Sequence, residues 1–386
     1  MKKILWLASW YPNKNSPFEG DFIQRHAKAL ALLNPVTVIY IAQGGIEQEE
    51  KKDIYIEHTT DGLTEIIYHF KFSKTGWSLL DTIRYNILYR KKAKQLLKNY
   101  FNIHGKPEIL HVHIPLKAGV LAQWIKRKFG IDYFVTEHSS HYVPYSFDAF
   151  EKRPFLHRLM TQKVFTEAKK VSTVSLDVLE KIRNFFPVKN AAVIPNVVDT
   201  SLFNYNDNNK GNTAFTFIHV SSLVSPHKNV TQIIGSFAKL AANNNNVKLV
   251  LVGPFNQDLV NMVDEHNLSP HITFTGEIAY TAVAQSMKDA DAFILFSDFE
   301  NLPCVILEAL CCGLPVISSH AGGIREVINN ENGILVNSIN EQALYDAMHT
   351  MYNQYASYNR QLISINGTNA FNYKKIATDF LAFYEG

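Results

Sequence analysis

Short apolar runs alternate with longer amphipathic segments along almost the whole chain. Before residue 200 the apolar runs occupy residues 4–9, 36–42, 65–70, 109–114, 133–138, 171–175 and 191–196. After residue 214 they occupy residues 215–222, 248–253, 272–276, 291–297, 315–319 and 333–336. Strands that alternate with helices pair in parallel, because the chain crosses back over the sheet through each helix. We therefore expect an α/β fold of two Rossmann-like, doubly wound parallel-sheet domains facing a cleft.

A polar, turn-rich segment at residues 201–214 interrupts this alternation. Its Asn, Asp and Gly residues are typical of a connection between domains. The chain has 386 residues, which is enough for about two domains of ~150 residues each. We place an N-terminal domain at residues 1–199 and a C-terminal domain at residues 200–367. The last helical segment, about residues 368–386, is expected to pack back on the N-terminal domain.

Composition and cysteine usage indicate an ordinary globular protein of a reducing compartment. Hydrophobic residues make up 46% of the chain and charged residues 19%. No apolar run approaches the ~18 residues of a membrane-spanning helix. The start MKKILWLASWYP is interpreted as a first strand rather than a signal peptide. Three cysteines give no disulfide framework and suit the cytoplasm, and the adjacent Cys311 and Cys312 are interpreted as small core residues rather than a redox pair.

The net charge of +3 conceals an asymmetry between the two halves. Up to Asp199 there are 29 Lys and Arg against 19 Asp and Glu, whereas the remainder has 9 against 16. The densest basic segment, residues 84–100, holds six Lys and Arg and no acidic residue. It is either the solvated face of an amphipathic helix or a contact with anionic membrane lipid. In the second case the protein would sit at the inner face of the cell membrane.

Two glutamates bracket the otherwise apolar stretch SDFENLPCVILEALCCGLPVISS at residues 297–319. The pattern predicts a buried strand, a turn that contains Glu300, and a helix with Pro303 at its first position and Gly313 at its end. Glu308 then lies inside the helix. The N–H groups of residues 302–305 are expected to point into the crevice where open α/β sheets bind ligands, and to hold phosphate oxygens there. A surface glutamate and a helix glutamate at this spacing also arise easily by chance. The surrounding sequence must therefore decide between a ligand-binding site and two unrelated glutamates.

That surrounding sequence resembles the GT-B fold glycosyltransferases, and glycosyltransferase family 4 in particular. The resemblance spans essentially the whole chain, in the family's order. It is carried by SWYPNKNSPFEGDFIQRHAKAL (9–30), TEHSSHY (136–142), IPNVVD (194–199), the E-x7-E segment (300–316) and AGGIREV (321–327).

The resemblance implies a reaction and the residues that perform it. A retaining enzyme would move a sugar from a nucleoside diphosphate to an acceptor hydroxyl, without a metal and with no cofactor beyond the nucleotide sugar. The acceptor is expected to be a saccharide or lipid-linked saccharide in surface polysaccharide or glycolipid synthesis. Glu300 and His138 are the expected catalytic residues. The expected donor-binding residues are Gly20, Ser222, Lys228, Ile278, Asn301, Leu302, Pro303, Cys304, Val305 and Glu308.

Departures from the family pattern leave alternatives open. Ser222 stands where the family usually has an arginine, although Lys228 is present. His227 could partly replace that cation, but a solvated loop histidine is the favoured interpretation. Asn301 replaces the glycine that commonly follows the first glutamate. A sugar-nucleotide epimerase of the same fold and a non-catalytic nucleotide-sugar-binding protein therefore remain alternatives.

Other residue patterns argue against different chemistries. No G-x-G-x-x-G follows a strand, which disfavours a dinucleotide-dependent dehydrogenase. No Walker A sequence occurs either. His111 and His113 share one face of a strand, and Asp289 and Asp291 form a D-x-D. The histidine pair has no evident third ligand, so we expect strand packing there. The D-x-D lies at a helix end that enters a buried strand, so we expect no metal site there either. No nucleic-acid partner is expected.

Overall fold

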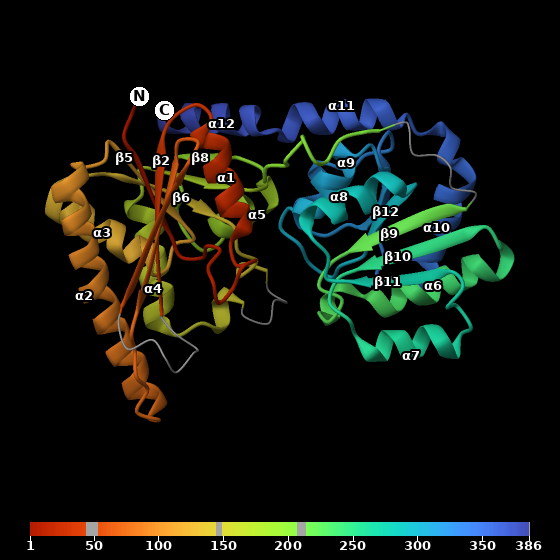
Figure 1. The fold of residues 1–386 in the computed structure, drawn as a ribbon, viewed down its shortest axis with the longest axis horizontal. Helices are drawn as coiled ribbons and strands as arrows, with labels where there is room; N and C mark the ends of the chain where they lie inside the picture. The colour runs from red at the N-terminus through yellow and green to blue at the C-terminus, as the bar shows by residue number, and fades with distance from the viewer. Residues whose placement is uncertain (44–52, 144–148, 207–213, 386) are drawn as a thin grey trace. The chain divides into compact units, whose positions relative to one another are not determined.

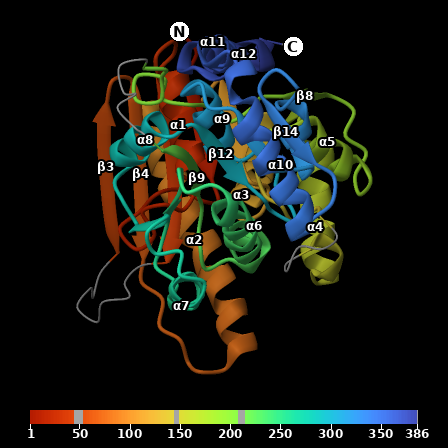
Figure 2. The ribbon, with the colours of Figure 1, turned by 90° about the vertical axis from the view of Figure 1, so that its right-hand side faces the viewer.

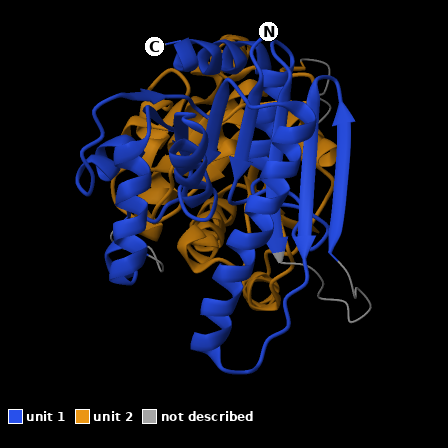
Figure 3. Cartoon of the chain, turned by 90° about the vertical axis from the view of Figure 1, so that its left-hand side faces the viewer, with its two compact units in different colours: residues 1–174, 178–195, 373–386 blue, residues 175–177, 196–372 orange. Residues whose placement is uncertain are grey.

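The computed structural model describes residues 1–43, 53–143, 149–206 and 214–385 (Figure 1). The chain divides into two units, coloured separately in Figure 3. Unit 1 comprises residues 1–174, 178–195 and 373–386, and unit 2 comprises residues 175–177 and 196–372. The sequence placed this division at residue 199 and the returning segment at about residue 368. Residues 207–213 of the predicted linker lie outside the described residues.

Unit 1 is built on an eight-stranded sheet with the order β3-β4-β2-β1-β5-β6-β7-β8. All of its pairings are parallel except β3 with β4. The strands are β1 (Ile4–Ala8), β2 (Val36–Gln43), β3 (Ile54–Thr60), β4 (Leu63–Phe70), β5 (Ile109–His113), β6 (Tyr133–Glu137), β7 (Lys170–Thr173) and β8 (Ala191–Val193).

Among the strands of the described residues, the antiparallel edge strand β3 is the one that was not predicted from the sequence. Its segment IYIEHTT is mostly exposed, so it lacks the dense apolar character of a buried parallel strand. Asp61 and Gly62, both with positive φ, connect it to β4. An Asp-Gly pair between two strands is a strong hairpin signal, and it could have identified β3.

The helices of unit 1 include the C-terminus of the chain. They are α1 (Asp21–Ala31), α2 (Ser78–His104), α3 (Ala118–Phe129), α4 (Phe155–Glu167), most of α5 (Leu176–Arg183) and α12 (Tyr373–Glu385), with a 3-10 turn at Phe150–Lys152. Helix α12 packs beside α1 (Figure 1) and buries Ile376, Ala377, Phe380, Phe383 and Tyr384. The Trp6 indole N–H of β1 donates a hydrogen bond to the Tyr384 hydroxyl at 3.0 Å. This contact ties the last helix to the first strand.

Unit 2 has a six-stranded, wholly parallel sheet with the order β11-β10-β9-β12-β13-β14. The strands are β9 (Phe215–Val220), β10 (Val247–Val252), β11 (Ile272–Gly276), β12 (Ala292–Leu295), β13 (Val316–Ser319) and β14 (Gly333–Val336). The order reverses between β9 and β12, because the chain builds outward from β9 first on one side and then on the other. Open α/β sheets bind ligands at such a switch point, outside the carboxyl ends of the strands.

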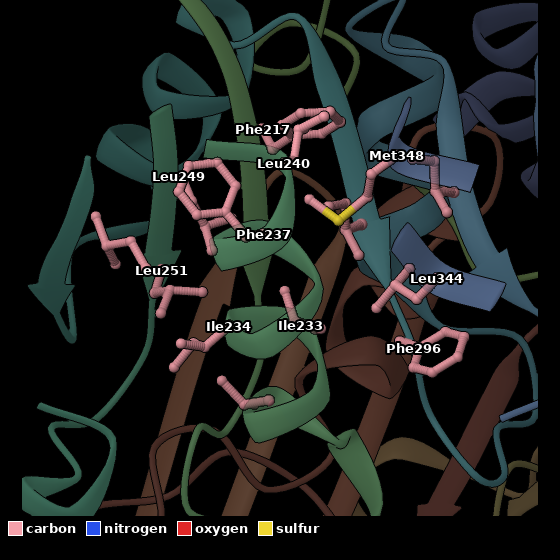
Figure 4. Close-up of a cluster of buried hydrophobic side chains, with 14 of the residues drawn as sticks. Phe217, Ile233, Ile234, Phe237, Leu240, Leu249, Leu251, Phe296, Leu344 and Met348 are labelled. Atoms are coloured by element: carbon pink, nitrogen blue, oxygen red, sulfur yellow. The ribbon is translucent and has the colours of Figure 1, made fainter. Parts of the chain in front are cut away.

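Helices and a large apolar core hold the unit 2 sheet. The helices are α6 (Val230–Asn243), α7 (Gln257–Glu265), α8 (Tyr280–Asp289), α9 (Cys304–Cys311), α10 (Glu341–Gln354) and α11 (Arg360–Phe371), with 3-10 turns at Pro226–Lys228, Gly322–Glu326 and Tyr355–Ser357. Helices α6 and α10 lie side by side (Figure 2). Figure 4 shows Phe237 and Leu240 of α6 beside Phe217 and Leu249 of the sheet, and Ile233 belongs to the same cluster. Burying each such side chain contributes about 1.5–3 kcal/mol, so this core fixes the strand ends that carry the site.

The two-domain α/β prediction is therefore confirmed. Every strand predicted from an apolar run is present, and the sheets are parallel apart from the β3 edge.

Candidate functional site

Two loops meet at the switch point of the unit 2 sheet, one after β9 and one after β12. The backbone N–H of Asp298 donates to the carbonyl of His227 at 2.9 Å. The side-chain amide of Asn229 donates to the Asp298 carboxylate at 2.6 Å. The His227 ring stacks on Phe299 with centroids 4.6 Å apart. His227 is a loop residue, as interpreted from the sequence, but it is half-buried rather than freely solvated, and burial lowers its pKa.

An ion pair joins the same two loops. The Lys228 ammonium lies 2.5 Å from the Glu300 carboxylate, and the two side chains are 16% and 11% exposed. Opposite charges attract strongly in so little solvent, so the pair holds both side chains in place. The structure thus brings together an expected phosphate-binding cation and an expected catalytic carboxylate, which are 72 residues apart in sequence.

Helix α9 begins immediately beyond this ion pair. It starts at Cys304, and Pro303 is its N-cap residue with φ −69° and ψ 127°. The prediction that Pro303 occupies the first helical position is therefore wrong by one residue. Pro303 also has no N–H, so it cannot donate to a phosphate as the sequence analysis expected of residues 302–305. The side-chain amide of Asn196 donates to the Leu302 carbonyl at 2.7 Å and holds the chain that enters the helix.

The N-terminus of α9 carries the partial positive charge of the helix dipole. The helix ends as predicted, because Gly313 adopts φ +72° beyond the last turn and its N–H bonds to the carbonyl of Leu310. Asn301, Leu302, Cys304 and Val305 follow Glu300 directly along this loop and first turn. The expected donor-binding residues of this segment therefore lie on one short piece of chain.

Glu308 lies deeper in α9 and is 2% exposed. Its carboxylate accepts a hydrogen bond from the Tyr280 hydroxyl at 2.7 Å, and the Tyr280 ring lies 4.9 Å from that of Phe203. A buried carboxylate needs such partners. Sequence reasoning missed Tyr280, because nothing local marks a tyrosine at the start of α8 as a partner of a glutamate 28 residues later.

The Gly-Gly turn of the sequence packs against the backbone of the Glu300 loop. Gly322 has φ +56°, and a Cβ there would lie 2.0 Å from the Glu300 carbonyl oxygen. The Gly323 N–H donates to the Asn301 carbonyl at 2.7 Å. Gly322 is therefore required by close backbone approach and by its dihedral angle, whereas Gly323 is required by close approach alone, because a Cβ there would lie 2.7 Å from the Asn301 carbonyl oxygen.

The remaining expected donor residues of unit 2 lie on loops at the same end of the sheet. Ser222 is exposed in the turn after β9, where its carbonyl accepts from the Ser225 N–H at 3.0 Å. Ile278 is half-buried between β11 and α8, two residues before Tyr280. Both therefore follow the carboxyl ends of parallel strands.

His138 belongs to unit 1 and follows β6. It is 7% exposed, and its Nε2 lies 3.1 Å from Nδ1 of His113. Its ring lies 4.9 Å from that of Phe22 and 5.5 Å from that of His26, both on α1. Burial holds the pKa of His138 well below its usual range. The imidazole is therefore neutral at physiological pH, able to accept or donate one hydrogen bond but unable to act as a fixed cation.

Glu137 positions His138 and was not identified from the sequence. It is fully buried, and its carboxylate accepts from the backbone N–H groups of His138 and Ser139 at 2.8 Å each. The same carboxylate accepts from the Tyr142 hydroxyl at 2.9 Å. An acidic residue at the end of an apolar strand was the signal that could have revealed this role.

Gly20 lies in the same part of unit 1, at the N-terminus of α1. It has φ +70°, and a Cβ would lie 2.7 Å from the Trp10 carbonyl carbon. Phe22, two residues later, contacts His138. Gly20 and His138 are thus both held at the first turn of α1, whereas the other expected site residues belong to unit 2.

The alternative metal candidates are engaged in structural contacts. The Asp291 carboxylate accepts from the Thr216 N–H at 2.9 Å and the Tyr355 hydroxyl at 3.1 Å. His111 contacts the hydroxyls of Tyr384 and Thr136 at 2.7 Å each. Within the described ranges, no group of three or more His, Cys, Asp and Glu is arranged to hold a metal ion.

The structure places the two adjacent cysteines in the core and the basic segment 84–100 on a helix. Cys311 and Cys312 are buried, as expected for core residues, and burial raises the pKa of Cys311 to about 12. The basic segment lies on α2, where Lys92 pairs with Asp53 at 2.5 Å. Among the described residues, no helix has the length and apolar character needed to cross a membrane.

Solved structures share this fold. A sucrose-phosphate synthase from Thermosynechococcus elongatus superposes with a TM-score of 0.76 over 100% of this chain and 98% of that chain, at 19% identity. HepE from Anabaena, solved in complex with UDP-glucose, gives a TM-score of 0.70 at 18% identity, with all of both chains covered. The fold is that of the GT-B glycosyltransferases.

Sequence comparison gives the family. The model for glycosyl transferases group 1 matches residues 203–366, and the model for Glycosyltransferase Family 4 matches residues 22–202. This chain belongs to the group 1 glycosyltransferases of the family 4 type.

Two curated relatives illustrate the similarity. Bacillus subtilis TuaC, named provisionally as a teichuronic acid biosynthesis glycosyltransferase, is 24% identical over 90% of this chain and 88% of its own length. Alpha-monoglucosyldiacylglycerol synthase of Streptococcus pneumoniae is 26% identical over 62% of this chain and 57% of its own length.

Proposed function

We propose that this glycosyltransferase transfers a sugar, with retention of configuration, from a nucleoside diphosphate to a hydroxyl of a lipid-linked saccharide. The observation that supports this most is the Lys228–Glu300 ion pair beside the N-terminus of α9, at the switch point of a parallel sheet. A cation, a helix N-terminus and a carboxylate there match the diphosphate and the sugar of such a donor.

The ion pair suggests how the donor binds. The diphosphate carries more negative charge than one carboxylate, so it would take over Lys228 and leave Glu300 to accept hydrogen bonds from sugar hydroxyls. The partial positive charge of α9, with the amides of Leu302, Cys304 and Val305, would add to this attraction. Glu308 would accept from the ribose hydroxyls while Tyr280 holds its carboxylate. Amides beside Gly20 would also bind the phosphates.

In the transfer step, the bond between the anomeric carbon and the leaving phosphate oxygen breaks and that oxygen keeps the electron pair. The acceptor oxygen forms the new bond on the same face and gives its proton to the departing phosphate. Lys228 and α9 would stabilise the negative charge that develops on the diphosphate. Glu300 would stabilise the positive charge at the anomeric carbon, and neutral His138 would orient the sugar by a hydrogen bond. This sequence needs no metal and no other cofactor.

The nature of the acceptor is supported by relatives and by charge. One relative is named for teichuronic acid biosynthesis and another for a glucosyldiacylglycerol. The basic segment 84–100 on α2 suits contact with anionic lipid at the inner face of the cell membrane.

Thermal-shift measurements with UDP-, GDP- and ADP-sugars test donor binding first. One donor class should raise the melting temperature, and this shift should be smaller in the Glu308→Ala variant at the same donor concentration. Incubation with that donor and a membrane-lipid extract should then yield glycosylated lipid. Turnover of donor alone into an epimer would favour an epimerase instead. Tight donor binding without turnover on any acceptor, which Ser222 in place of arginine makes conceivable, would favour a binding protein.

A further inference from the structure

A second candidate site lies on unit 1, where the surfaces of helices α2 and α3 meet. These two helices lie side by side (Figure 1). Residues 82–131, which include most of α2 and the whole of α3, hold eleven Lys and Arg but a single acidic residue, Glu108. The basic surface therefore belongs to both helices rather than to the segment 84–100 alone.

Some cations of this surface already have a carboxylate partner. Lys126 pairs with Asp132 at 2.8 Å, and Arg127 pairs with Glu167 at 3.6 Å. Four lysines of α2, α3 and the turn after α2 form no ion pair with any residue that the structure describes: Lys94, Lys98, Lys106 and Lys128. Their charges are therefore available to an external anion.

Two half-buried aromatic rings bring three of these lysines together. The rings of Trp124 and Phe129 contact each other edge to face, with centroids 5.5 Å apart. The ammonium groups of Lys94 and Lys128 lie 5.4 and 5.7 Å from the Trp124 centroid. Those of Lys106 and Lys128 each lie 5.5 Å from the Phe129 centroid. Cation–π attraction therefore gathers ammonium groups from three separate places in the sequence.

The gathered lysines repel one another. Lys98 follows Lys94 by four residues, so both lie on the same face of α2. The charge of Lys98 lowers the pKa of the Lys128 amine, and the charge of Lys94 lowers it further. The dipole of α3 accounts for cations in its own last turn, but it does not account for two lysines of α2 beside them. An anion between the ammonium groups would remove this repulsion.

The number of cations indicates which anion fits. A phosphate monoester carries about −1.5 to −2 charges at neutral pH and has three acceptor oxygens, whereas a carboxylate or a phosphate diester carries one charge. Lysine binds phosphate as a point charge. Several ammonium groups from two helices therefore match a phosphate monoester better than a singly charged group.

The face of α2 that carries these lysines is apolar in earlier turns. Ile83 and Ile87 are 48% and 64% exposed. They precede Lys94 by about three and two turns of a helix with ~3.6 residues per turn, so all three side chains lie on one side of α2. Exposed apolar residues in line with cations are typical of a helix that contacts lipid. A lipid head group therefore suits this surface better than a soluble phosphate.

We propose that Lys94, Lys98, Lys106 and Lys128 form a binding site for the phosphate monoester head group of a membrane lipid. This inference rests on the proposed function for the source of the lipid, because the proposed contact with the membrane would supply it. It goes beyond that contact, which needs only diffuse charge on α2. The site adds residues of α3 and of the turn after α2, and it specifies the charge of the head group that is bound.

Co-sedimentation of the full chain with two kinds of vesicle tests the proposal. Phosphatidylcholine vesicles contain either phosphatidic acid, a monoester, or phosphatidylglycerol, a diester, in amounts that give equal surface potential. The protein should bind the phosphatidic acid vesicles about fivefold more tightly. Lys94→Gln and Lys128→Gln should each remove this preference, because fewer ammonium groups then remain for the second charge of the monoester.

Lys126→Gln is the matched control for Lys128→Gln. It removes the same charge from the same helix, at a lysine that is paired with Asp132. A diffuse attraction would lose as much affinity in one variant as in the other, whereas a discrete site predicts that Lys126→Gln keeps the preference for phosphatidic acid. Melting temperatures of the variants without lipid show whether the fold is kept.

Three outcomes would overturn the proposal. The first is equal affinity of the wild type for the two kinds of vesicle, and the second is an equal effect of Lys126→Gln and Lys128→Gln on the preference. The third is calorimetric binding of pyrophosphate as tight as that of the phosphatidic acid vesicles, which would assign the site to a soluble phosphate. Thermal shifts with the sugar nucleotides are recorded on the same samples. A protein that binds its donor but does not prefer phosphatidic acid would refute this site and leave the proposed transferase intact.

Discussion

At the scale of single residues, the two glutamates that bracket the α9 segment have different surroundings and therefore different expected roles. Glu300 forms an ion pair with Lys228 of the neighbouring loop, so it can release this partner when a ligand binds. Glu308 is buried and accepts a hydrogen bond from the Tyr280 hydroxyl, so its carboxylate is held in place as a hydrogen-bond acceptor. Glu300 is therefore expected to change its partner when a ligand binds, whereas Glu308 is expected to keep the same partner.

Replacing Glu300 by Gln should lower kcat by about a hundredfold or more, since one preorganised electrostatic contact to a transition state is worth that much. Donor affinity should change little, because the loss of the carboxylate also releases Lys228 for the diphosphate. Steady-state kinetics with calorimetric donor titration separate the two effects. Glu331→Gln, at an exposed site in the same unit, is the control. Unaltered kcat in Glu300→Gln would remove Glu300 from the mechanism.

Replacing Glu308 by Ala should mainly weaken donor binding, by about tenfold to a hundredfold, because hydrogen bonds to a carboxylate contribute about 1.5–3 kcal/mol. Tyr280→Phe keeps the carboxylate but removes its 2.7 Å partner, and it should weaken binding by a smaller factor. Melting temperatures of both variants without ligand show whether the fold is kept. Donor affinity equal to that of the wild type in Glu308→Ala would contradict the assignment.

At the scale of elements, the site depends on backbone segments that approach one another more closely than side chains allow. The Gly322–Glu326 turn packs on the carbonyls of Glu300 and Asn301, and the loops after β9 and β12 bond to each other. These contacts, rather than local propensity, set where Glu300 lies.

Gly322→Ala should therefore destabilise unit 2 and displace the Glu300 loop. The new Cβ would sit 2.0 Å from the Glu300 carbonyl oxygen, in addition to the strain of φ +56°. We expect a loss of about 2–3 kcal/mol in the free energy of unfolding together with reduced kcat. The matched control is Gly130→Ala, which has φ +72° with open space around the added Cβ and should lose only about 1 kcal/mol. Equal losses in the two variants would show that the close approach is unimportant.

Liposome co-sedimentation tests the role of α2 as an element. The protein should sediment with vesicles that contain phosphatidylglycerol and much less with pure phosphatidylcholine, and salt should weaken the binding because the attraction is electrostatic. Arg90→Gln combined with Lys91→Gln, both exposed, should reduce it. Equal binding to both vesicle types would refute electrostatic attachment.

At the scale of the whole molecule, buried histidines make stability depend on pH. His26, His111, His113 and His138 lie together in unit 1, and His219 is buried in unit 2. Burial lowers the pKa of His26 and of His219 to about 4. In the unfolded chain the histidine pKa values are near ~6.5. The unfolded chain therefore binds protons at pH values where the buried histidines of the folded state are still neutral. Stability is therefore full above about pH 6.5 and falls as the pH drops toward about 4.

Urea unfolding at about pH 7 and about pH 5 measures this effect. His26 alone should contribute a loss of about 2 kcal/mol over that interval, and the other buried histidines add losses of the same sign. His26→Gln should be less stable at neutral pH but should show a weaker pH dependence. A free energy of unfolding that stays constant from pH 7 to pH 5 would show that these imidazoles are hydrated or already charged in the folded state.

The sequence alone determined the succession of elements and the segments that carry the chemistry. Apolar runs gave the buried parallel strands, Gly313 gave the end of α9, and the E-x7-E and Gly-Gly segments indicated the donor site. These signals are local, since each depends on residues within a few positions of one another. The tertiary structure decided the rest: the Lys228–Glu300 ion pair, the hydrogen bond from Tyr280 to Glu308, and the stacking of His227 on Phe299. Each of these contacts depends on which strands become neighbours, and that order is set by burial of the whole sheet rather than by any short stretch of sequence.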